Sequence, residues 1–223
     1  MPRHYDKIVS IKPVAKPSNL EYLIQIMIST IQRFAVVSAL SLSPIFAQEP
    51  PVSGPGPTDE EAKHTEEDRA KLANLDKVPG FGGVAFGAAF PAKGFEVEQD
   101  RGALKIYKKS GEKLLMGPAL LETVLYYVFD GKLYGVAFHT NDGQDSLALK
   151  SVFINAFGFG QNSADEGPTT VWLGKKNGAL FDLNTSTGDG SAFLFDIKLH
   201  DSCLAEQSAS AKAASQQLIQ GKP

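Results

Sequence analysis

The chain has 223 residues, of which 22 are basic and 25 acidic, and its formal net charge is −3. This acidic balance and the lack of a Lys/Arg cluster argue against nucleic acid or an anionic lipid surface as the partner, because phosphate binding draws on grouped basic side chains. Cys203 is the only cysteine, so an internal disulfide is excluded and the hydrophobic core must hold the fold.

The N-terminal part of the chain has the layout of an export signal. Residues 27–33 form a short positive lead, residues 34–46 are apolar, and Ala47 is a small residue before a Pro-rich stretch. The apolar run is shorter than the roughly 20 residues that span a bilayer. We therefore predict that residues 27–47 are a signal peptide, that translation starts at Met27, and that the protein is periplasmic or secreted. A genuine longer leader or a retained amphipathic anchor is the alternative.

The rest of the chain divides by composition. Residues 48–78 contain a Pro-rich spacer and a polar helix over 58–77. Thr58 and Glu61 have the spacing of a capping box at the start of this helix. Alternating apolar and aromatic residues then predict a core domain over 79–200. Residues 201–223 are rich in Ala, Ser and Gln and would form a helical or disordered tail. The signal peptide has no Cys at its cleavage point, so no lipid or other stable membrane anchor is expected after cleavage.

The middle of the core domain predicts a hairpin. Asp130-Gly131 favours a two-residue turn, and regular pairing from that turn places Tyr126 opposite Gly135. A large ring over a glycine would leave a shallow groove for a ligand, although the ring could equally cover the glycine. Each face of the hairpin would be apolar, with Val136 and Phe138 beside Tyr127 on the bulkier one. Such a hairpin belongs in the centre of a sheet.

Further elements are predicted on either side of this hairpin. Strands are expected at residues 82–86, 104–108, 114–116 and 191–199. A helix is expected over 147–157, with Asp145 or Ser146 as its N-cap and Gly158 at its end. This helix would cover the smaller face of the hairpin. Asn177-Gly178 predicts the turn of a second hairpin, with Trp172 opposite Leu183. The fold class is therefore α+β: an antiparallel sheet of about six to eight strands packed by one main helix, with a polar N-terminal helix and an Ala-rich C-terminal helix or tail.

Three groups of residues have side chains suited to chemistry. His139, Asp142 and Asp145 could bind a metal or act as acid and base, but a turn and a helix cap explain each of them separately. Residues 182–189 imitate the start of a calcium loop and lack its Gly and Glu positions. Residues 200–203 contain His, Asp, Ser and Cys, which we interpret as a strand end and a helix cap, with Cys203 a packed thiol.

The hairpin also carries a resemblance. Phe-Gly-Gly-Val-x-Phe-Gly at 81–87, Tyr-x-Phe-x-Gly-Lys-Leu-Tyr-x-Val at 127–136, Phe157-Gly158 and Trp172 resemble a class of small exported bacterial proteins of uncharacterised function. The layout is also similar to envelope modules and secreted inhibitors built on a helix-covered antiparallel sheet. This resemblance implies a fold and a mode of action by protein contact, and it implies no catalytic site.

The sequence thus predicts a non-catalytic binding module of the cell envelope, with a protein partner and with no cofactor or metal. The candidate binding residues are Tyr126, His139, Asp142 and Trp172, and the candidate surface is the edge of the second hairpin together with the Tyr126/His139 end of the first. A periplasmic carrier of a small ligand held between sheet and helix is one alternative. A hydrolase or metal-dependent enzyme centred on His139, Asp142 and Asp145 is the other.

Overall fold

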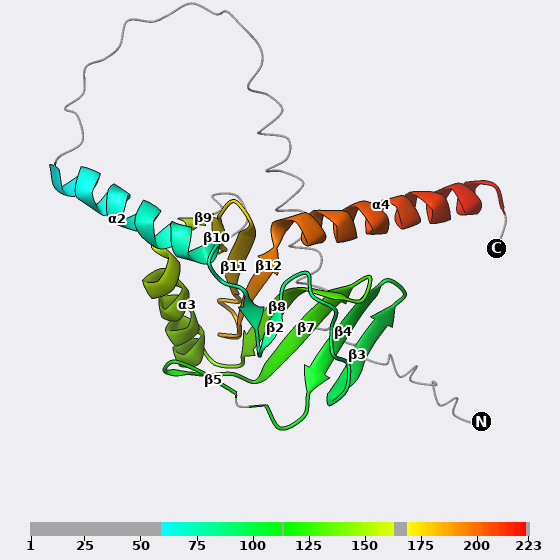
Figure 1. Ribbon diagram of the computed structural model, residues 1–223, viewed down its shortest axis with the longest axis horizontal. Helices are drawn as coiled ribbons and strands as arrows, with labels where there is room; N and C mark the ends of the chain where they lie inside the picture. The colour runs from blue at the N-terminus through cyan, green and yellow to red at the C-terminus, as the bar shows by residue number, and fades with distance from the viewer. Residues whose placement is uncertain (1–58, 113, 163–168, 222–223) are drawn as a thin grey trace, which may run out of the picture. The chain divides into compact units, whose positions relative to one another are not determined.

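The computed structural model describes residues 59–112, 114–162 and 169–221, and side chains from residue 66 onward. The predicted signal peptide, the Met27 start, the Pro-rich spacer and the Thr58 cap lie outside the described residues. The fold is α+β, with one main antiparallel sheet, as predicted (Figure 1). The helices of the described part are α2 (Asp59–Leu75), α3 (Gly143–Phe157) and α4 (Ile197–Ile219).

The main sheet has eight strands in the order β3-β4-β7-β8-β12-β11-β10-β9, and every neighbouring pair is antiparallel. Its strands are β3 (Phe95–Arg101), β4 (Leu104–Lys109), β7 (Thr123–Phe129), β8 (Lys132–Thr140), β9 (Gln161–Asn162), β10 (Thr170–Leu173), β11 (Asn177–Leu183) and β12 (Gly190–Asp196). Two small hairpins accompany it, made by β1 (Gly80–Phe81) with β2 (Val84–Ala85) and by β5 (Leu115–Met116) with β6 (Ala119–Leu120). The first replaces the single strand predicted over 82–86.

The central hairpin has the predicted turn and a different register beyond it. Asp130 and Gly131 have φ values of 48° and 74°, as a type I′ turn requires, and Phe129 pairs with Lys132. One extra residue, Tyr134, then interrupts β8, so Tyr127 pairs with Gly135 and Tyr126 with Val136. The predicted pairing of Tyr126 with Gly135 is therefore wrong, because a β-bulge shifts the rest of the strand by one position.

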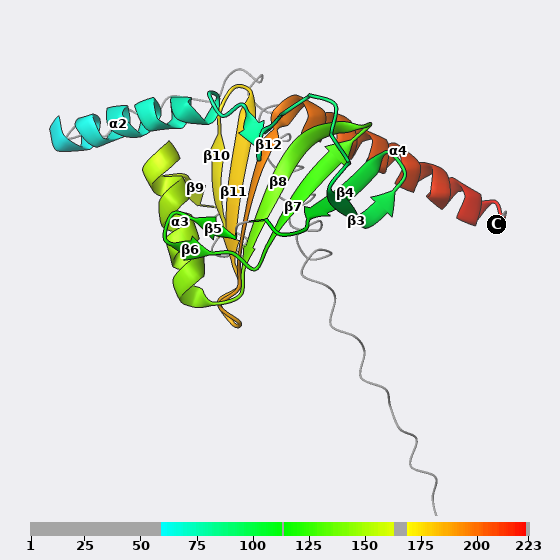
Figure 2. The ribbon, with the colours of Figure 1, turned by 60° about the horizontal axis from the view of Figure 1, so that its bottom comes forward.

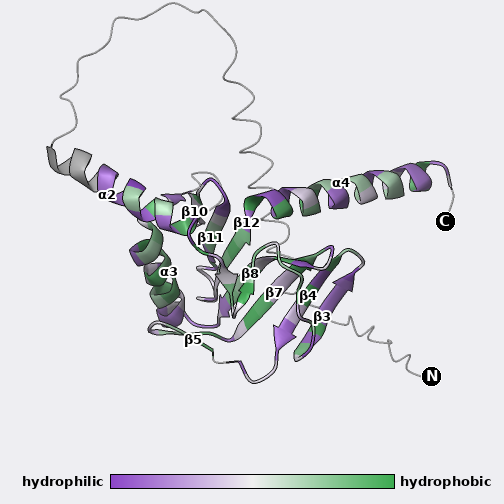
Figure 3. Ribbon diagram, viewed as in Figure 1, coloured by the Kyte–Doolittle hydropathy of each residue, from purple (hydrophilic) through white to green (hydrophobic). Residues whose placement is uncertain are grey.

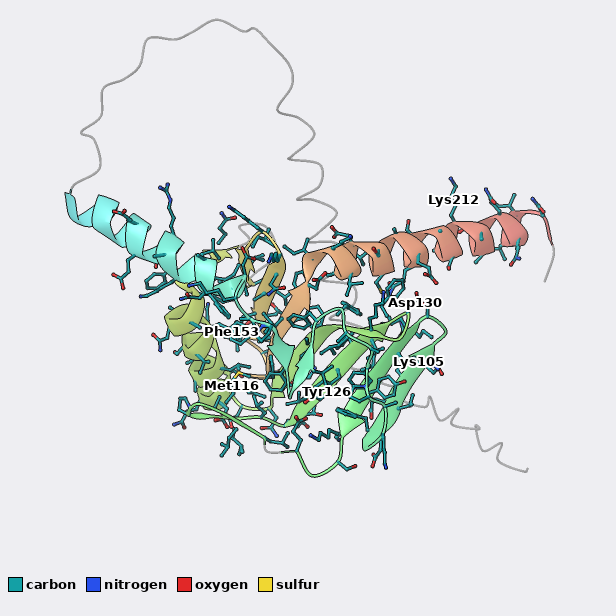
Figure 4. All side chains as sticks on the ribbon, in the orientation of Figure 1. Lys105, Met116, Tyr126, Asp130, Phe153 and Lys212 are labelled. Atoms are coloured by element: carbon teal, nitrogen blue, oxygen red, sulfur yellow. The ribbon has the colours of Figure 1, made fainter. Side chains whose placement is uncertain are left out.

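The bulge sorts the hairpin side chains between two buried faces. Val136 and Phe138 join Tyr126 on the face that packs under α3, instead of joining Tyr127 as the regular register would require. On this face the ring of Phe153 of α3 packs edge-on against Phe138 and tilted against Trp172, with ring centroids 6.3 and 5.7 Å apart. Met116 and Phe153 both lie on this α3 side, where the small hairpins complete the core (Figure 4). The strands at the centre of the sheet are correspondingly hydrophobic (Figure 3).

The opposite face carries the start of α4 (Figure 2). The prediction of a strand over 191–199 is wrong from Ile197 onward, because the side chain of Asp196 accepts a hydrogen bond from the Leu199 N–H at 2.8 Å and so caps a helix. His200 packs against Phe195 at a centroid distance of 4.6 Å. Residues 200–203 are thus helical, and the rest of α4, where Lys212 lies, is largely exposed (Figure 4).

The second hairpin is turned earlier than predicted. Trp172 pairs with Ala179, not with Leu183, and the turn lies at residues 174–176 instead of Asn177-Gly178. Asp76, just after α2, explains the difference: its carboxylate accepts hydrogen bonds of 2.7–3.1 Å from the backbone N–H groups of residues 175–177. The side chain of Asn177 in turn donates to the carbonyls of Leu75 and Val78, both at 2.9 Å. This clamp joins the end of α2 to the sheet.

The helix α3 also begins earlier than predicted. Asp142, and not Asp145 or Ser146, is its N-cap, and the side chain accepts from the N–H groups of Gln144 and Asp145 at 2.8 and 2.9 Å. The helix ends at Gly158 as predicted, with φ of 80°. Asp68 of α2 lies against this end, since its Oδ1 accepts from the Phe159 N–H at 3.3 Å. The polar helix α2 therefore contacts the domain through its second half.

Replacement of Asp76 by Ala tests the clamp. Three backbone donors lose their carboxylate partner, and we expect the free energy of unfolding to fall by about 1–3 kcal/mol in urea denaturation. The matched control is Asp100→Ala, because Asp100 is an exposed carboxylate that accepts from Lys105 Nζ at 2.8 Å and from the Gly102 N–H at 3.0 Å, and solvent-exposed contacts of this kind contribute little to stability. Equal losses for the two variants would contradict the clamp.

Candidate functional site

Tyr126 does not lie on a surface. Its side chain is fully buried, and its hydroxyl hydrogen-bonds to the carboxylate of Glu112. A Cβ added to Gly82 would come within 2.7 Å of this hydroxyl, so the loop before β2 lies directly over the ring. Burial is the main cause that raises the pKa of Tyr126 well above its ordinary value, and the hydrogen bond to Glu112 raises this pKa further. The predicted groove between Tyr126 and Gly135 does not form, and Tyr126 is a core residue.

Trp172 is equally a core residue. Its side chain is 1% exposed, and its indole N–H donates to the carbonyl of Gly158 at 2.8 Å. This bond ties the C-terminal end of α3 to β10. The space between the sheet and α3, where a small ligand was one alternative, is filled here by the rings of Trp172, Phe153 and Phe138.

The acidic residues near His139 accept hydrogen bonds from backbone N–H groups. Asp142 caps α3, and Oδ1 of Asp145 accepts from the Leu120 N–H at 2.9 Å, which fastens β6 to the start of the helix. Backbone donation from Asp145 holds the pKa of Asp142 below its ordinary value. Within the described ranges, no group of three His, Cys, Asp or Glu side chains is arranged to hold a metal ion.

His139 belongs to a different cluster, which sequence reasoning missed. It pairs across the strands with Thr123 of β7 and with Ser191 of β12, and directly opposite residues share a face of the sheet. Nδ1 of His139 lies 2.9 Å from the hydroxyl of Ser191. Ser191 pairs with Asp182 of β11, and Asp182 accepts from the hydroxyl of Thr169 at 2.8 Å.

We call these five side chains the polar row: Thr123, His139, Ser191, Asp182 and Thr169. In the part of the chain that the structure describes, two of its buried atoms have no hydrogen-bond partner, Nε2 of His139 and the hydroxyl oxygen of Thr123. Buried polar groups of this kind are costly and few in native proteins, so each requires an explanation. The polar Ser191 at the start of an otherwise aromatic strand is the one local signal in the sequence for this row.

Three solvent-exposed leucines lie on elements near the same end of the central hairpin. Leu115 and Leu120 are paired on β5 and β6 and are 51% and 58% exposed, and Leu147 in the first half of α3 is 57% exposed. The Asp145 bond to the Leu120 N–H connects the small hairpin to the helix. We call Leu115, Leu120 and Leu147 the leucine patch. Leu115 and Leu120 are adjacent, and adjoining exposed apolar groups are a common feature of interaction surfaces.

A cavity of about 320 Å³ lies between α4 and the sheet. Its lining includes Arg101, Leu104, Phe129, Cys203 and Glu206. Cys203 is 1% exposed, and burial raises the pKa of its thiol, while the side chain of Gln207 donates to its sulfur at 3.3 Å. A thiol with a raised pKa is a poor nucleophile. Cys203 is therefore a packed side chain in the wall of the cavity.

Comparison with protein-family models, with curated proteins and with solved structures found no match for this chain. No helix in the described ranges has the length and apolar character that crossing a membrane demands. The candidate functional features of the described part are therefore the leucine patch, the polar row and the cavity.

Two buried histidines predict acid sensitivity. Burial lowers the pKa of His139 and of His200 to about 4, and neither Nε2 has a partner among the described residues. Both folded-state values lie below the unfolded value of about 6.5, so protonation favours unfolding and stability is fully present only above that pH. As the pH falls from 7 to 5, we expect each histidine to remove about 1–2 kcal/mol from the free energy of unfolding.

The measurement is urea denaturation at pH 7 and pH 5 for the natural chain and for the His139→Gln/His200→Gln double variant. The variant should show a smaller difference between the two pH values, because the glutamines do not titrate. Carboxylates with lowered pKa values, such as Asp76, titrate below this window. The same pH dependence in both proteins would contradict this origin.

Proposed function

We propose that this protein is an exported, non-catalytic binding module of the cell envelope, and that it holds a protein partner through the leucine patch. The observation that carries the proposal is the exposure of the paired Leu115 and Leu120 on β5 and β6, and of Leu147 on the helix α3 that contacts β6, beside a core that is otherwise closely packed. The patch lies at the His139 end of the central hairpin, because β6 leads into β7 and the Glu122 N–H donates to the His139 carbonyl at 2.7 Å.

The charges around the patch define the kind of partner. Glu122 follows Leu120 by two residues and is exposed, and Asp142 and Asp145 lie in the α3 start that carries Leu147. An apolar centre with an acidic rim is complementary to an apolar segment that basic residues flank. The partner is therefore expected to present Leu, Met or aromatic side chains between Lys or Arg residues.

A carrier of a small ligand is the second candidate, and the cavity beside Cys203 favours it. Its volume of about 320 Å³ is at the lower limit of small-molecule sites, and Arg101 and Glu206 supply opposite charges at its wall. Native mass spectrometry of the protein from its own host distinguishes the two functions. A retained metabolite would support the carrier, whereas a protein complex would support the binding module.

The patch is tested by site-specific photocrosslinking in the native host. A photoreactive residue at position 120 or 147 should crosslink one and the same envelope protein, and the contact should weaken as salt screens the acidic rim. With that partner purified, Leu120→Gln/Leu147→Gln should weaken binding by about tenfold or more, because buried leucine contacts are lost.

Leu173 supplies the matched control, since it is a 45% exposed leucine on β10, outside the patch. Leu173→Gln should leave the affinity unchanged, and all variants should melt within a few degrees of the natural chain. Crosslinking that is as strong at position 173, or equal loss of affinity in the control, would refute the patch as the docking surface.

Export is tested separately by N-terminal sequencing. The chain expressed from Met27 with a C-terminal tag should be recovered from the periplasm or medium with Gln48 as its first residue. An uncleaved chain that begins at Met27 and is recovered from the cytoplasmic fraction would contradict the proposed localisation. That result would leave the proposal for the docking surface unchanged.

A further inference from the structure

The polar row is built by strand register and is not explained by protein binding at the leucine patch. Thr123, His139 and Ser191 stand directly opposite one another on three neighbouring strands, on the face that does not pack under α3. The next positions on that face are apolar, with Leu125, Ala137 and Phe193 in register. The row is thus a polar strip at the end of an apolar face.

We infer the proton positions of the row from its hydrogen bonds. Nδ1 of His139 and the hydroxyl of Ser191 form one hydrogen bond in which the imidazole tautomer decides which atom donates, and we assign the Ser191 hydroxyl as the donor. The imidazole is neutral at pH 7, since burial lowers the pKa of His139 to about 4. Its proton then resides on Nε2, which becomes an unpaired donor beside the unpaired hydroxyl of Thr123.

Two unpaired donors on adjacent strands are suited to one ligand group. Cβ atoms of directly opposite residues are about 5 Å apart, so both donors can reach the oxygens of a single carboxylate or amide. His139 is 8% exposed, whereas Thr123 and Ser191 are partly exposed, and Thr123 is the first residue of its strand. Both unpaired atoms are themselves shielded from solvent, so a ligand group would enter from the end of the sheet, where Thr123 and Ser191 are partly exposed.

We propose that Thr123 and His139 form the polar end of a small-molecule site that binds an acceptor oxygen, of a carboxylate or of an amide carbonyl. Ser191 acts as a positioning residue, because it sets the imidazole tautomer, and the bond between Asp182 and Thr169 fixes the far end of the row. This site is distinct from the leucine patch and from the cavity beside Cys203, and it does not depend on the proposed function.

The test is a titration of the full chain with ¹⁵N-labelled histidine, using acetate and acetamide as probes at pH 7. We expect a saturable shift of the His139 Nε2 signal, while the signal of His200, which is also buried and unpartnered, stays in place. Saturation by acetate alone identifies a carboxylate site, and saturation by acetamide identifies a carbonyl site.

Thr123→Val removes the hydroxyl and keeps the shape of the side chain. It should weaken the probe by tenfold or more and leave the melting temperature unchanged or higher, because an unpaired buried hydroxyl is lost. Absence of a saturable shift with either probe would overturn the proposal, as would a shift that Thr123→Val does not alter. A lower melting temperature without any probe shift would overturn it too, since the hydroxyl would then serve only the fold.

Discussion

The extra residue Tyr134 in β8 determines which side chains the rest of the structure can use. Without it, Val136 and Phe138 would leave the core under α3, and His139 would move to that face. Gly135 permits the arrangement, because a Cβ there would lie 2.4 Å from the Phe193 ring. One bulge thus closes the core and at the same time places His139 opposite Thr123, on the face that carries Ser191.

Contacts at the edges of the sheet complete this arrangement. The Asp76 and Asn177 clamp joins α2 to the turn after β10, and three leucines remain exposed where β5, β6 and α3 meet. A second bulge at Glu98 interrupts the edge strand β3, where carboxylates also oppose pairing with another chain. The surfaces that we propose for binding are the leucine patch and the open end of the polar row.

Local patterns in the sequence predict much of the fold, including the Asp130-Gly131 turn, the strand over 104–108 and the end of the main helix at Gly158. Some of the errors depend on distant partners, and others on local caps. The second turn is displaced by Asp76, which precedes it by about 100 residues, and strand propensity over 191–199 yields to the Asp196 cap. The polar row joins residues 52 positions apart, so no spacing rule could find it. The sequence predicts Tyr126 and Trp172 as binding residues, whereas both side chains are buried in the core.

Cross-strand NOEs between the backbone protons of β7 and β8 test the central bulge most directly. The structure requires contacts that pair Thr123 with His139 and Leu125 with Ala137 beyond Tyr134. An uninterrupted two-residue hairpin would instead pair Thr123 with Phe138 and Leu125 with Val136. The first set of contacts would support both the packing under α3 and the polar row, and the second would contradict both.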